Sequence, residues 1–373
     1  MINSIISSVR ADDANVSLLL DWSDGRTDQF HYIWLKDNDP ALREKNGQIN
    51  HDPFDIHIDI KPRTFDYTGE MLVIEWEGGY GSSRYDAAWL AKHSYQTNIV
   101  SASRPRRLGW TTEEMSKQFQ KHNYQSVANT DDGLRNLLQC VWDHGFAILE
   151  NVPERDGMVI EVSRLFGYPR ETNYGTMFEL MGSPTAEDRG HDNAFLPSHV
   201  DNPYRNPIPT VQLLHCMRNS VAGGESTIVD GIRVAEEVQL RDKQAFELLS
   251  SIPVTYRYHD DDVDLSSEGP IIRINQRNEI IGILASPINV QPFDCAPDIM
   301  LPFYKAYHLI GSLIRSPVFR FQTKLNSGDL MIMDNTRVLH GRTAFHSDGA
   351  RRLQGCYADI DGMWSKLAVL KEF

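Results

Sequence analysis

The chain has 373 residues, of which 41% are hydrophobic and 24% charged, an ordinary composition for a soluble globular protein. This length suits one large domain or two unequal ones. The formal net charge of -14 argues against a nucleic-acid-binding surface, because phosphate recognition relies on clustered Lys and Arg.

The cysteines are few and widely spaced, and none forms a CxxC pair: Cys140, Cys216, Cys295 and Cys356. Disulfide scaffolds are short and rich in cysteine, so we expect reduced, mostly buried thiols. The N-terminus shows no charged and apolar signal-peptide pattern, and no apolar stretch approaches the ~20 residues of a membrane span. We therefore expect a cytoplasmic protein.

Residues 1–96 are predicted to form a small β-rich N-terminal domain. Strand-like runs cover 16–22 and 71–76, and each ends at a Gly-containing turn signal. A short helix is expected over 86–93. The polar stretch 97–107, which carries Ser-Arg-Pro, is predicted to link this domain to a second one that covers 108–373.

The second domain is predicted to be mainly β with α-helical insertions. A capping box at Thr111 to Glu114 begins one helix, and a second helix covers 131–144 before a buried strand at 146–149. Strands then alternate with turns over 211–217, 226–230, 254–258, 271–275, 280–285, 318–324, 329–333 and 353–360, with helices at about 234–251 and 298–315. Many strands and few helices indicate a sandwich or jelly roll, whose mouth is a natural ligand site.

Two histidines and one aspartate carry the strongest chemical signal. His199 and Asp201 stand two residues apart, so in an extended strand their side chains point to the same face. His340 follows the apolar run 329–334 and is expected near the end of a core strand. Two imidazoles and one carboxylate are the ligand set that holds non-haem Fe(II) and leaves open positions. Because a single HxD tripeptide often arises by chance, the interpretation depends on the segments around it.

Two of these segments suit a dicarboxylic cosubstrate. Arg351 lies eleven residues after His340, at the start of an apolar strand, where a guanidinium can pair with a carboxylate through two hydrogen bonds. Strand alternation allows only one of Arg351 and Arg352 to point inward. Gly223-Gly224 permits a tight turn, and the hydroxyl of Ser226 can join the same carboxylate, although a plain hairpin turn is the alternative.

Taken in order, these segments resemble the Fe(II)- and 2-oxoglutarate-dependent dioxygenases of the taurine dioxygenase type, and most closely the γ-butyrobetaine and trimethyllysine hydroxylases. The similar motifs are His-Val-Asp-Asn-Pro-Tyr-Arg at 199–205 and the stretches 211–216, 223–226, 228–231, 339–342 and 355–359, with 32–38 in the N-terminal domain. The resemblance implies an α+β fold, namely a double-stranded β-helix (jelly-roll) core with helical insertions and a small N-terminal domain. It also implies a homodimer.

The same resemblance implies roles for individual residues. His199, Asp201 and His340 would bind Fe(II), while Ser226 and Arg351 would bind 2-oxoglutarate, with O2 as the second cosubstrate. The reaction would be hydroxylation of an unactivated C–H bond in a small molecule, with neither nucleic acid nor membrane as partner. The carboxylate of Asp201 disfavours halogenation, because halogenating relatives carry a small residue at this position.

For the substrate, the resemblance implies a trimethylammonium group in an aromatic cage. Tyr174 and Phe178 match cage aromatics, His191 and Asn202 stand where relatives have tyrosines, and Tyr357 lies on the ligand-bearing sheet. The amides of Asn193, Asn202 and Asn289 are candidates for the anionic end, which is a carboxylate or a phosphonate. The alternative for Tyr174 and Phe178 is core packing at i,i+4 spacing on a helix.

A structural zinc is not expected. Animal relatives place zinc-binding cysteines just after the Asp-Asn pair, whereas residues 39–43 here contain none. A substitute site from His51, Asp52 and His57 is the alternative.

Three other functions remain open from the residues. The same triad would serve a Zn(II) or Mn(II) hydrolase, or it would be incidental in a non-catalytic cupin-like binding protein. The third alternative keeps the cofactors and exchanges the substrate for a sulfonate or another amine.

Overall fold

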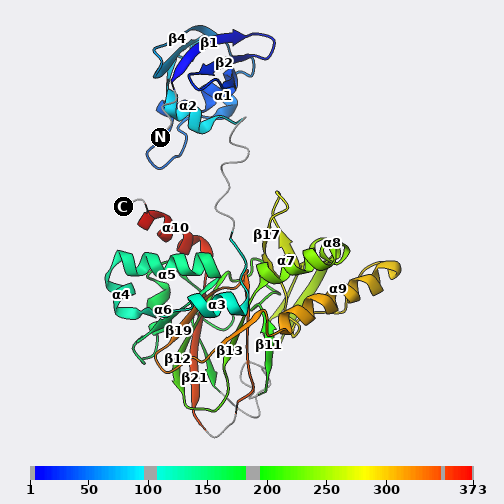
Figure 1. The fold of residues 1–373 in the computed structure, drawn as a ribbon. Coiled ribbons are helices and arrows are strands. Elements are labelled where there is room, and N and C mark those ends of the chain that lie inside the picture. Colours follow the sequence, from blue (N-terminus) through cyan, green and yellow to red (C-terminus); the bar gives the residue numbers. More distant parts are fainter. Residues whose placement is uncertain (1–4, 96–106, 182–193, 346–348, 372–373) are drawn as a thin grey trace. The chain divides into compact units, whose positions relative to one another are not determined.

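The computed structural model describes residues 5–95, 107–181, 194–345 and 349–371. Contacts within the chain divide it into two compact units, Met1–Arg106 and Arg107–Phe373, which Figure 1 shows. The predicted linker at 97–107 lies outside the described residues, except for residue 107. None of the helices in these ranges combines the length and apolar character needed to cross a membrane.

The N-terminal unit contains two three-stranded antiparallel sheets. Their strands are β1 (Ile6–Asp12), β2 (Ser17–Trp22), β3 (Thr27–His31), β4 (Pro62–Tyr67), β5 (Met71–Trp76) and β6 (Ser82–Asp86). The helices are α1 (Tyr32–Asp37) and α2 (Ala87–His93), with short 3-10 turns at Pro40–Leu42 and Pro53–Asp55. Buried Leu18, Leu20, Leu72, Ile74 and Trp76 form much of its core.

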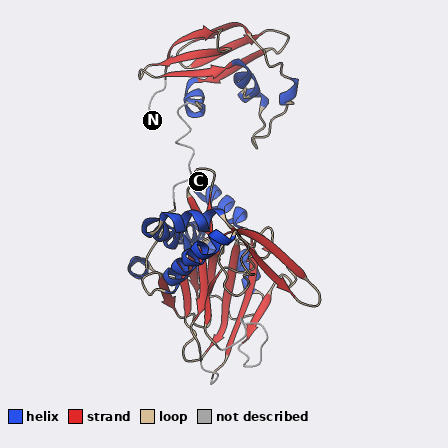
Figure 2. Cartoon of the chain, turned by 90° about the vertical axis from the view of Figure 1, so that its right-hand side faces the viewer, coloured by secondary structure: helices blue, strands red, loops and turns tan. Residues whose placement is uncertain are grey.

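The second unit is built on two facing sheets, seen as red arrows in Figure 2. Their strands pair antiparallel, except for the parallel pair of β7 with β8 in the larger sheet. The larger sheet runs β10 (Phe178–Met181), β21 (Arg351–Ala358), β12 (Val211–Asn219), β19 (Leu330–Asp334), β8 (Phe146–Glu150) and β7 (His122–Asn123), with β9 (Pro169–Arg170) beside β21. The smaller sheet runs β11 (Leu196–His199), β20 (Val338–Arg342), β13 (Ser226–Asp230) and β18 (Arg320–Thr323). The chain crosses repeatedly between the sheets, so the fold is a double-stranded β-helix, as predicted.

Helices cover the outer faces of both sheets. Beside the larger sheet pack α4 (Tyr124–Asn129), α5 (Asp131–His144), α6 (Met158–Ser163) and α10 (Ile360–Lys371). Beside the smaller sheet pack α7 (Gly231–Arg241), α8 (Lys243–Ser251) and α9 (Pro297–Arg315), with the hairpins β14 (Pro253–His259)–β15 (Asp264–Pro270) and β16 (Ile272–Ile274)–β17 (Ile280–Ile283). The remaining helix, α3 (Thr112–Gln118), begins at the predicted capping box of Thr111 and Glu114.

The alternation of side chains along the strands decides which residues face the space between the sheets. On β13 and β20, Ile228 and Val338 belong to the cluster between the sheets, whereas Val229 and Leu339 pack outward against the helices. His340 stands two residues after Val338 on β20, so its side chain points to the same face, into the space between the sheets. Inward-facing polar residues are therefore set into an otherwise apolar layer.

Three predicted features differ from the structure. His340 does not end the strand that contains 329–334, because a turn at 335–337 carries the chain into β20 in the opposite sheet. Asp201 lies in a bend two residues beyond the end of β11, not within the strand. The helix expected over 234–251 is two helices, because the chain breaks at Asp242, whose side chain caps α8 by accepting from Ala245 N.

Candidate active site

The three candidate metal ligands converge in the second unit. His199 and His340 are directly opposed on β11 and β20, with ring centroids 4.5 Å apart. Asp201 Oδ1 lies 3.1 Å from Nε2 of His199 and 3.7 Å from Nε2 of His340. The candidate ligand atoms all lie within 4.8 Å of one another, and no other such group occurs among the described residues. Each ring therefore turns one nitrogen toward the same point.

Neighbouring groups orient these side chains. The carbonyl oxygen of Pro197 lies 2.8 Å from His199 Nδ1, so Nδ1–H donates to it and Nε2 keeps its lone pair for a metal. Tyr357 and Gln212 are cross-strand neighbours on β21 and β12, and both donate to Asp201 Oδ2, Tyr357 at 2.7 Å. Because Oδ2 is engaged, Oδ1 remains on the side of the histidines.

Asn335 fixes the backbone of Asp201. Its Oδ1 accepts from Asp201 N at 2.8 Å, and its Nδ2 donates to Asp201 O at 2.9 Å and to Pro209 O at 2.8 Å. Asn335 is buried and stands in the turn that leads into β20. One amide therefore ties the bend that contains Asp201 to the strand that contains His340.

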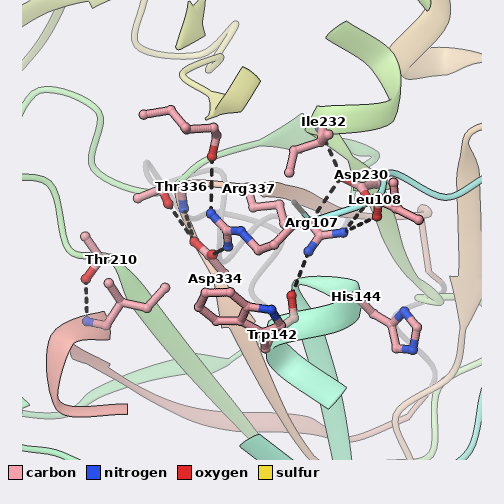
Figure 3. A network of polar contacts seen from close by, with 12 residues as sticks. Arg107, Leu108, Trp142, His144, Thr210, Asp230, Ile232, Asp334, Thr336 and Arg337 are labelled. Carbon is pink, nitrogen blue, oxygen red and sulfur yellow. Dashed lines mark hydrogen bonds and ion pairs between the residues drawn. The ribbon is translucent and has the colours of Figure 1, made fainter. Parts of the chain in front are cut away.

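A buried ion network sets the entry into β20, and Figure 3 shows its members. Arg337 is fully buried and pairs with Asp230 at 2.9 Å, while its guanidinium also donates to the carbonyl oxygens of Leu108 and Trp142. Asp230 caps α7 at the end of β13 by accepting from Ile232 N at 2.9 Å. Buried charges are tolerated when paired and hydrogen-bonded in this way, so the network holds the ends of β13 and β20 together.

The protonation states of the triad suit a divalent cation. Burial alone raises the pKa of Asp201, but His340, His199 and the Tyr357 hydrogen bond outweigh it and lower that pKa to about 2. Burial and the neighbouring His199 lower the pKa of His340 to about 4, against the opposing effect of Asp201. At neutral pH the group thus offers one carboxylate and neutral imidazole, the donor set that Fe(II) takes.

The triad opens into a cavity of about 1060 Å³. The predicted site residues that the structure describes all line it: His199, Asp201, His340, Ser226, Arg351, Tyr174, Phe178, Asn202, Asn289 and Tyr357. The other two predicted residues, His191 and Asn193, lie outside the described residues. Residues far apart in the sequence are therefore brought to one concave surface.

Of the two adjacent arginines, Arg351 lines the cavity, and Arg352 forms ion pairs with Glu179 and Asp156. Arg351 is half-buried, its guanidinium carbon lies 5.3 Å from the Phe345 ring centroid, and no described residue accepts a hydrogen bond from its Nε. Burial lowers the pKa of Arg351. A desolvated guanidinium that has no carboxylate partner in the described part of the chain suits an anionic ligand.

Aromatic rings line the wall beside the triad. The ring of Phe178 lies 5.2 Å from that of Tyr357 and 6.4 Å from that of Tyr174. Tyr174 lies in a turn and Phe178 begins β10, so the alternative of packing on a helix is wrong. Tyr204 and Tyr258 extend the wall, with stacked rings 5.2 Å apart.

The sequence analysis gave no individual role to Gln212, Asn335, Tyr204 or Tyr258. Gln212 is a polar residue within the mostly apolar stretch that begins β12, a pattern that signals a buried polar contact but not its partner. Tyr258 reaches the cavity only because β14 packs beside the segment 287–289, and no local motif indicates that placement.

The substitute metal site considered in the N-terminal unit does not form. His51 Nε2 lies 3.1 Å from Asp37 Oδ1, whereas the His57 side chain is mostly exposed and lies beside Asp59. Asp52 caps the 3-10 turn Pro53–Asp55 by accepting from Phe54 N. Each of the three residues therefore has a separate local partner.

Comparison with known proteins gives two family matches. A model described as "Taurine catabolism dioxygenase TauD, TfdA family" matches residues 106–357, and one described as "Gamma-butyrobetaine hydroxylase-like, N-terminal" matches residues 9–91. These matches confirm the predicted resemblance.

Individual relatives extend over nearly the whole chain. The gamma-butyrobetaine dioxygenase of Pseudomonas sp. (strain AK-1) is 32% identical over 361 residues, covering 94% of this chain and 92% of that protein. The mitochondrial trimethyllysine dioxygenase of Bos taurus is 29% identical over 356 residues, covering 92% of this chain and 83% of that protein. An asparagine oxygenase structure with Fe(II), a hydroxyasparagine and succinate aligns at TM-score 0.49 and 17% identity, over 63% of this chain and 82% of that chain.

The full-length relatives are named dioxygenases, and this chain carries the matching donor set in a double-stranded β-helix. The hydrolase and the non-catalytic binding protein are therefore set aside. The chain belongs to the TauD/TfdA family and is an Fe(II)- and 2-oxoglutarate-dependent dioxygenase that acts on a small molecule.

Proposed function

We propose that this enzyme hydroxylates an unactivated C–H bond of a small quaternary-ammonium zwitterion, resembling either γ-butyrobetaine or trimethylaminoethylphosphonate. The observation that carries the proposal is the aromatic wall beside the His199–Asp201–His340 group. A trimethylammonium group offers no hydrogen-bond donor, so aromatic faces are the natural means of binding it. The two relatives compared above are named for substrates of this class.

We assign the metal to His199, Asp201 and His340, and 2-oxoglutarate to Arg351 and Ser226. Bound Fe(II) supplies O2 activation coupled to decarboxylation of the keto acid, chemistry that belongs to the metal and cosubstrate. The chain itself presents the imidazoles of His199 and His340, fixes one carboxylate oxygen through Tyr357 and Gln212, and offers a desolvated guanidinium. Its cavity holds the substrate beside the metal and limits the access of water.

The cationic end of the substrate is assigned to Tyr174, Phe178 and Tyr357. Each ring contributes roughly 0.5–2 kcal/mol of cation–π attraction, depending on how far it is desolvated. The hydroxyl of Tyr357 is committed to Asp201, so its ring face and not its hydroxyl is left for the substrate. Tyr357 would therefore contact both the substrate cation, through its ring, and the metal ligand Asp201, through its hydroxyl.

The anionic end is assigned to Asn202 and Asn289. The Nδ2 of Asn202 is buried without a hydrogen-bond partner among the described residues, while its Oδ1 accepts from the Tyr204 hydroxyl. A buried donor left unpaired is costly, so an oxyanion of the substrate would relieve that cost. Carboxylate and phosphonate both meet this requirement, and a sulfonate is the alternative.

The test is decarboxylation of 2-oxoglutarate with γ-butyrobetaine, trimethyllysine, trimethylaminoethylphosphonate and taurine offered separately. We expect stimulation by at least one trimethylammonium compound. The Tyr174→Ala variant should raise the KM for that compound about tenfold and leave the KM for the keto acid unchanged, because one ring is lost from the cage. The control is Tyr168→Ala, since Tyr168 is 85% exposed and lies outside the cavity lining. Stimulation by taurine alone would contradict the proposal.

We further propose that the enzyme is a cytoplasmic homodimer, with an N-terminal domain over 1–96, a linker at 97–107 and a catalytic domain over 108–373. The homodimer is proposed because dimers are usual in the family that the sequence resembles. Sedimentation equilibrium of the full chain tests it, and a monomeric mass at micromolar concentration would contradict it.

A further inference from the structure

The hairpin β14–β15 forms part of the cavity wall. Its inner strand is anchored in the core, because Val254 and Tyr256 are buried and the Tyr256 hydroxyl donates to Leu284 O at 2.6 Å. Arg257 N donates to Asn289 O at 3.1 Å, which ties the hairpin to a second segment of the wall. The end of β14 and the turn beyond it thus stand at a defined place beside the cavity.

Tyr258, near the end of this strand, joins the aromatic wall. Its ring stacks on Tyr204 at 5.2 Å with an interplanar angle of 24°, and its centroid lies 6.2 Å from that of Tyr174. The Tyr174 and Tyr204 hydroxyls lie 3.3 Å apart. The three rings come from three separate segments of the chain, so their convergence arises only in the folded protein.

Asp260 places a carboxylate on the same wall. Its Oδ2 accepts from the Tyr258 hydroxyl at 2.8 Å, and its Oδ1 accepts from Asp262 N and Val263 N at 2.9 Å each. These contacts fix the orientation of the carboxylate, and Asp260 is exposed to solvent at the cavity wall. No Lys or Arg of the described residues pairs with it.

The other acidic residues that line the cavity are differently engaged. Asp201 belongs to the metal group, and Glu179 is paired with Arg352. Asp260 is therefore the cavity-lining carboxylate with neither a metal role nor an Arg partner among the described residues. A carboxylate in this setting attracts a cation that cannot donate a conventional hydrogen bond, although water screens part of the attraction.

We propose that Tyr258 and Asp260 are specificity-determining residues that select the positively charged head of the substrate, Tyr258 by its ring face and Asp260 by its charge. This inference rests on the proposed function and adds a third chain segment to the cage, beside 174–178 and β21. In this proposal the carboxylate of Asp260 distinguishes a cation from an uncharged group of the same shape. The ring alone would bind both, although less tightly when the charge is absent.

The experiment takes the trimethylammonium compound that stimulates turnover most and compares it with its neutral carbon isostere, in which a tert-butyl group replaces trimethylammonium. The readout is the ratio of their kcat/KM values, measured by succinate formation. Asp260→Asn keeps the Oδ1 acceptor of the turn and removes the charge, so we expect the preference for the cation to fall about three- to fivefold, as for an exposed charge. Tyr258→Leu should raise the KM for the same trimethylammonium compound about tenfold, while the KM for the keto acid stays unchanged.

Asp264→Asn is the matched control, since Asp264 lies on the same hairpin, pairs with Arg257 and does not line the cavity. It should leave the ratio at the wild-type value. An unchanged ratio in Asp260→Asn, with wild-type preference for the cation intact, overturns this inference and leaves the proposed function standing. Absence of that preference in the wild-type enzyme overturns both.

Discussion

Asn335 illustrates how a residue outside the triad positions it. Because its side chain pairs with both backbone groups of Asp201, an Asn335→Leu variant leaves a buried N–H and a carbonyl without partners. We expect the Kd for Fe(II) to rise about 10–100-fold, the range usual for loss of an outer-shell contact. Anaerobic Fe(II) titration of the folded variant measures this. A lowered melting temperature with an unchanged Kd would show that Asn335 serves stability alone.

His215 gives the second unit a pH-dependent stability. It is fully buried on β12, both ring nitrogens lack partners among the described residues, and burial lowers its pKa to about 4. In the unfolded chain the pKa of this histidine is about 6.5, so between about pH 6.5 and 4 the unfolded state binds a proton that the folded state does not bind. Stability is therefore complete above pH 6.5 and falls as the pH drops toward 4, by roughly 2 kcal/mol between pH 7 and 5.

Denaturant unfolding of wild type and His215→Leu across this range is the test. The difference in unfolding free energy between the two proteins should shift by that amount as the pH falls. The control is His308→Leu, since His308 is exposed on α9. Parallel pH curves for wild type and His215→Leu would refute the assignment.

For single residues, the sequence predicted site positions where the chemistry requires a particular residue type. The three candidate ligands and Arg351 are unusual in their contexts, so their types and spacing pointed to one site. Gln212, Tyr204 and Tyr258 gave no such signal, because glutamine and tyrosine in strands or turns are common for many reasons. Their roles arise from the partners that the fold brings to them.

Among the elements, β20 is the one that the metal group most depends on. Gly341 follows His340, and a Cβ there would lie 2.6 Å from Leu196 O and 3.0 Å from Ser198 N, both on β11. The Gly341→Ala variant must push β11 away from β20, which separates His199 from His340. We expect weaker Fe(II) binding together with a lower melting temperature.

Gly311→Ala provides the comparison, because the added Cβ meets only the end of the Arg315 side chain at 3.6 Å within α9. This change should leave Fe(II) binding intact and preserve or raise the melting temperature, since alanine favours a helix by about 1 kcal/mol over glycine. Equal Fe(II) affinity in Gly341→Ala and wild type would contradict the role given to β20.

Sequence patterns located most elements but not their partners. The predicted strands at 71–76 and 226–230 and the predicted helix at 131–144 matched β5, β13 and α5, because each has a clear periodicity and a clear end. The missed turn before β20 lies in Asn335-Thr336-Arg337, in which the side chains of Asn335 and Arg337 are engaged in tertiary contacts. Local propensity does not reveal contacts of that kind.

At the scale of the whole molecule, the N-terminal unit has a buried polar cluster in the region of its 39–43 segment, which contains no cysteine. Asp39 is buried there, accepts from Ser83 Oγ at 2.6 Å and lies 3.5 Å from Lys36 Nζ, while the Trp76 indole donates to Ser83 Oγ at 2.7 Å. This cluster joins α1, the first 3-10 turn, β5 and β6. We predict that it holds the unit together in place of a metal.

Removing one member of a buried ion pair typically costs about 3–5 kcal/mol, so Asp39→Ala should destabilise the N-terminal unit by that order. Zinc chelation should leave its melting temperature unchanged, and Asp59→Ala, at a side chain that is 77% exposed, should have little effect. A melting temperature that falls on chelation in iron-free protein would instead indicate a structural metal.

For the whole molecule, the number of strands and the resemblance together predicted the double-stranded β-helix. The strand order and register were not predictable in this way, since the pairing of His199 with His340 and of Gln212 with Tyr357 depends on contacts across the entire domain. The cavity that contains the predicted site residues follows from that register. The site is thus a property of the assembled sheets.

The central claim is that His199, Asp201 and His340 hold one ferrous ion beside 2-oxoglutarate. The most direct test is succinate formation by metal-free protein titrated with Fe(II), in wild type and in His340→Ala. We predict activity that saturates at one Fe(II) per wild-type chain and falls at least a hundredfold in the variant. Undiminished succinate formation without iron, or an unaltered titration in His340→Ala, would contradict the claim.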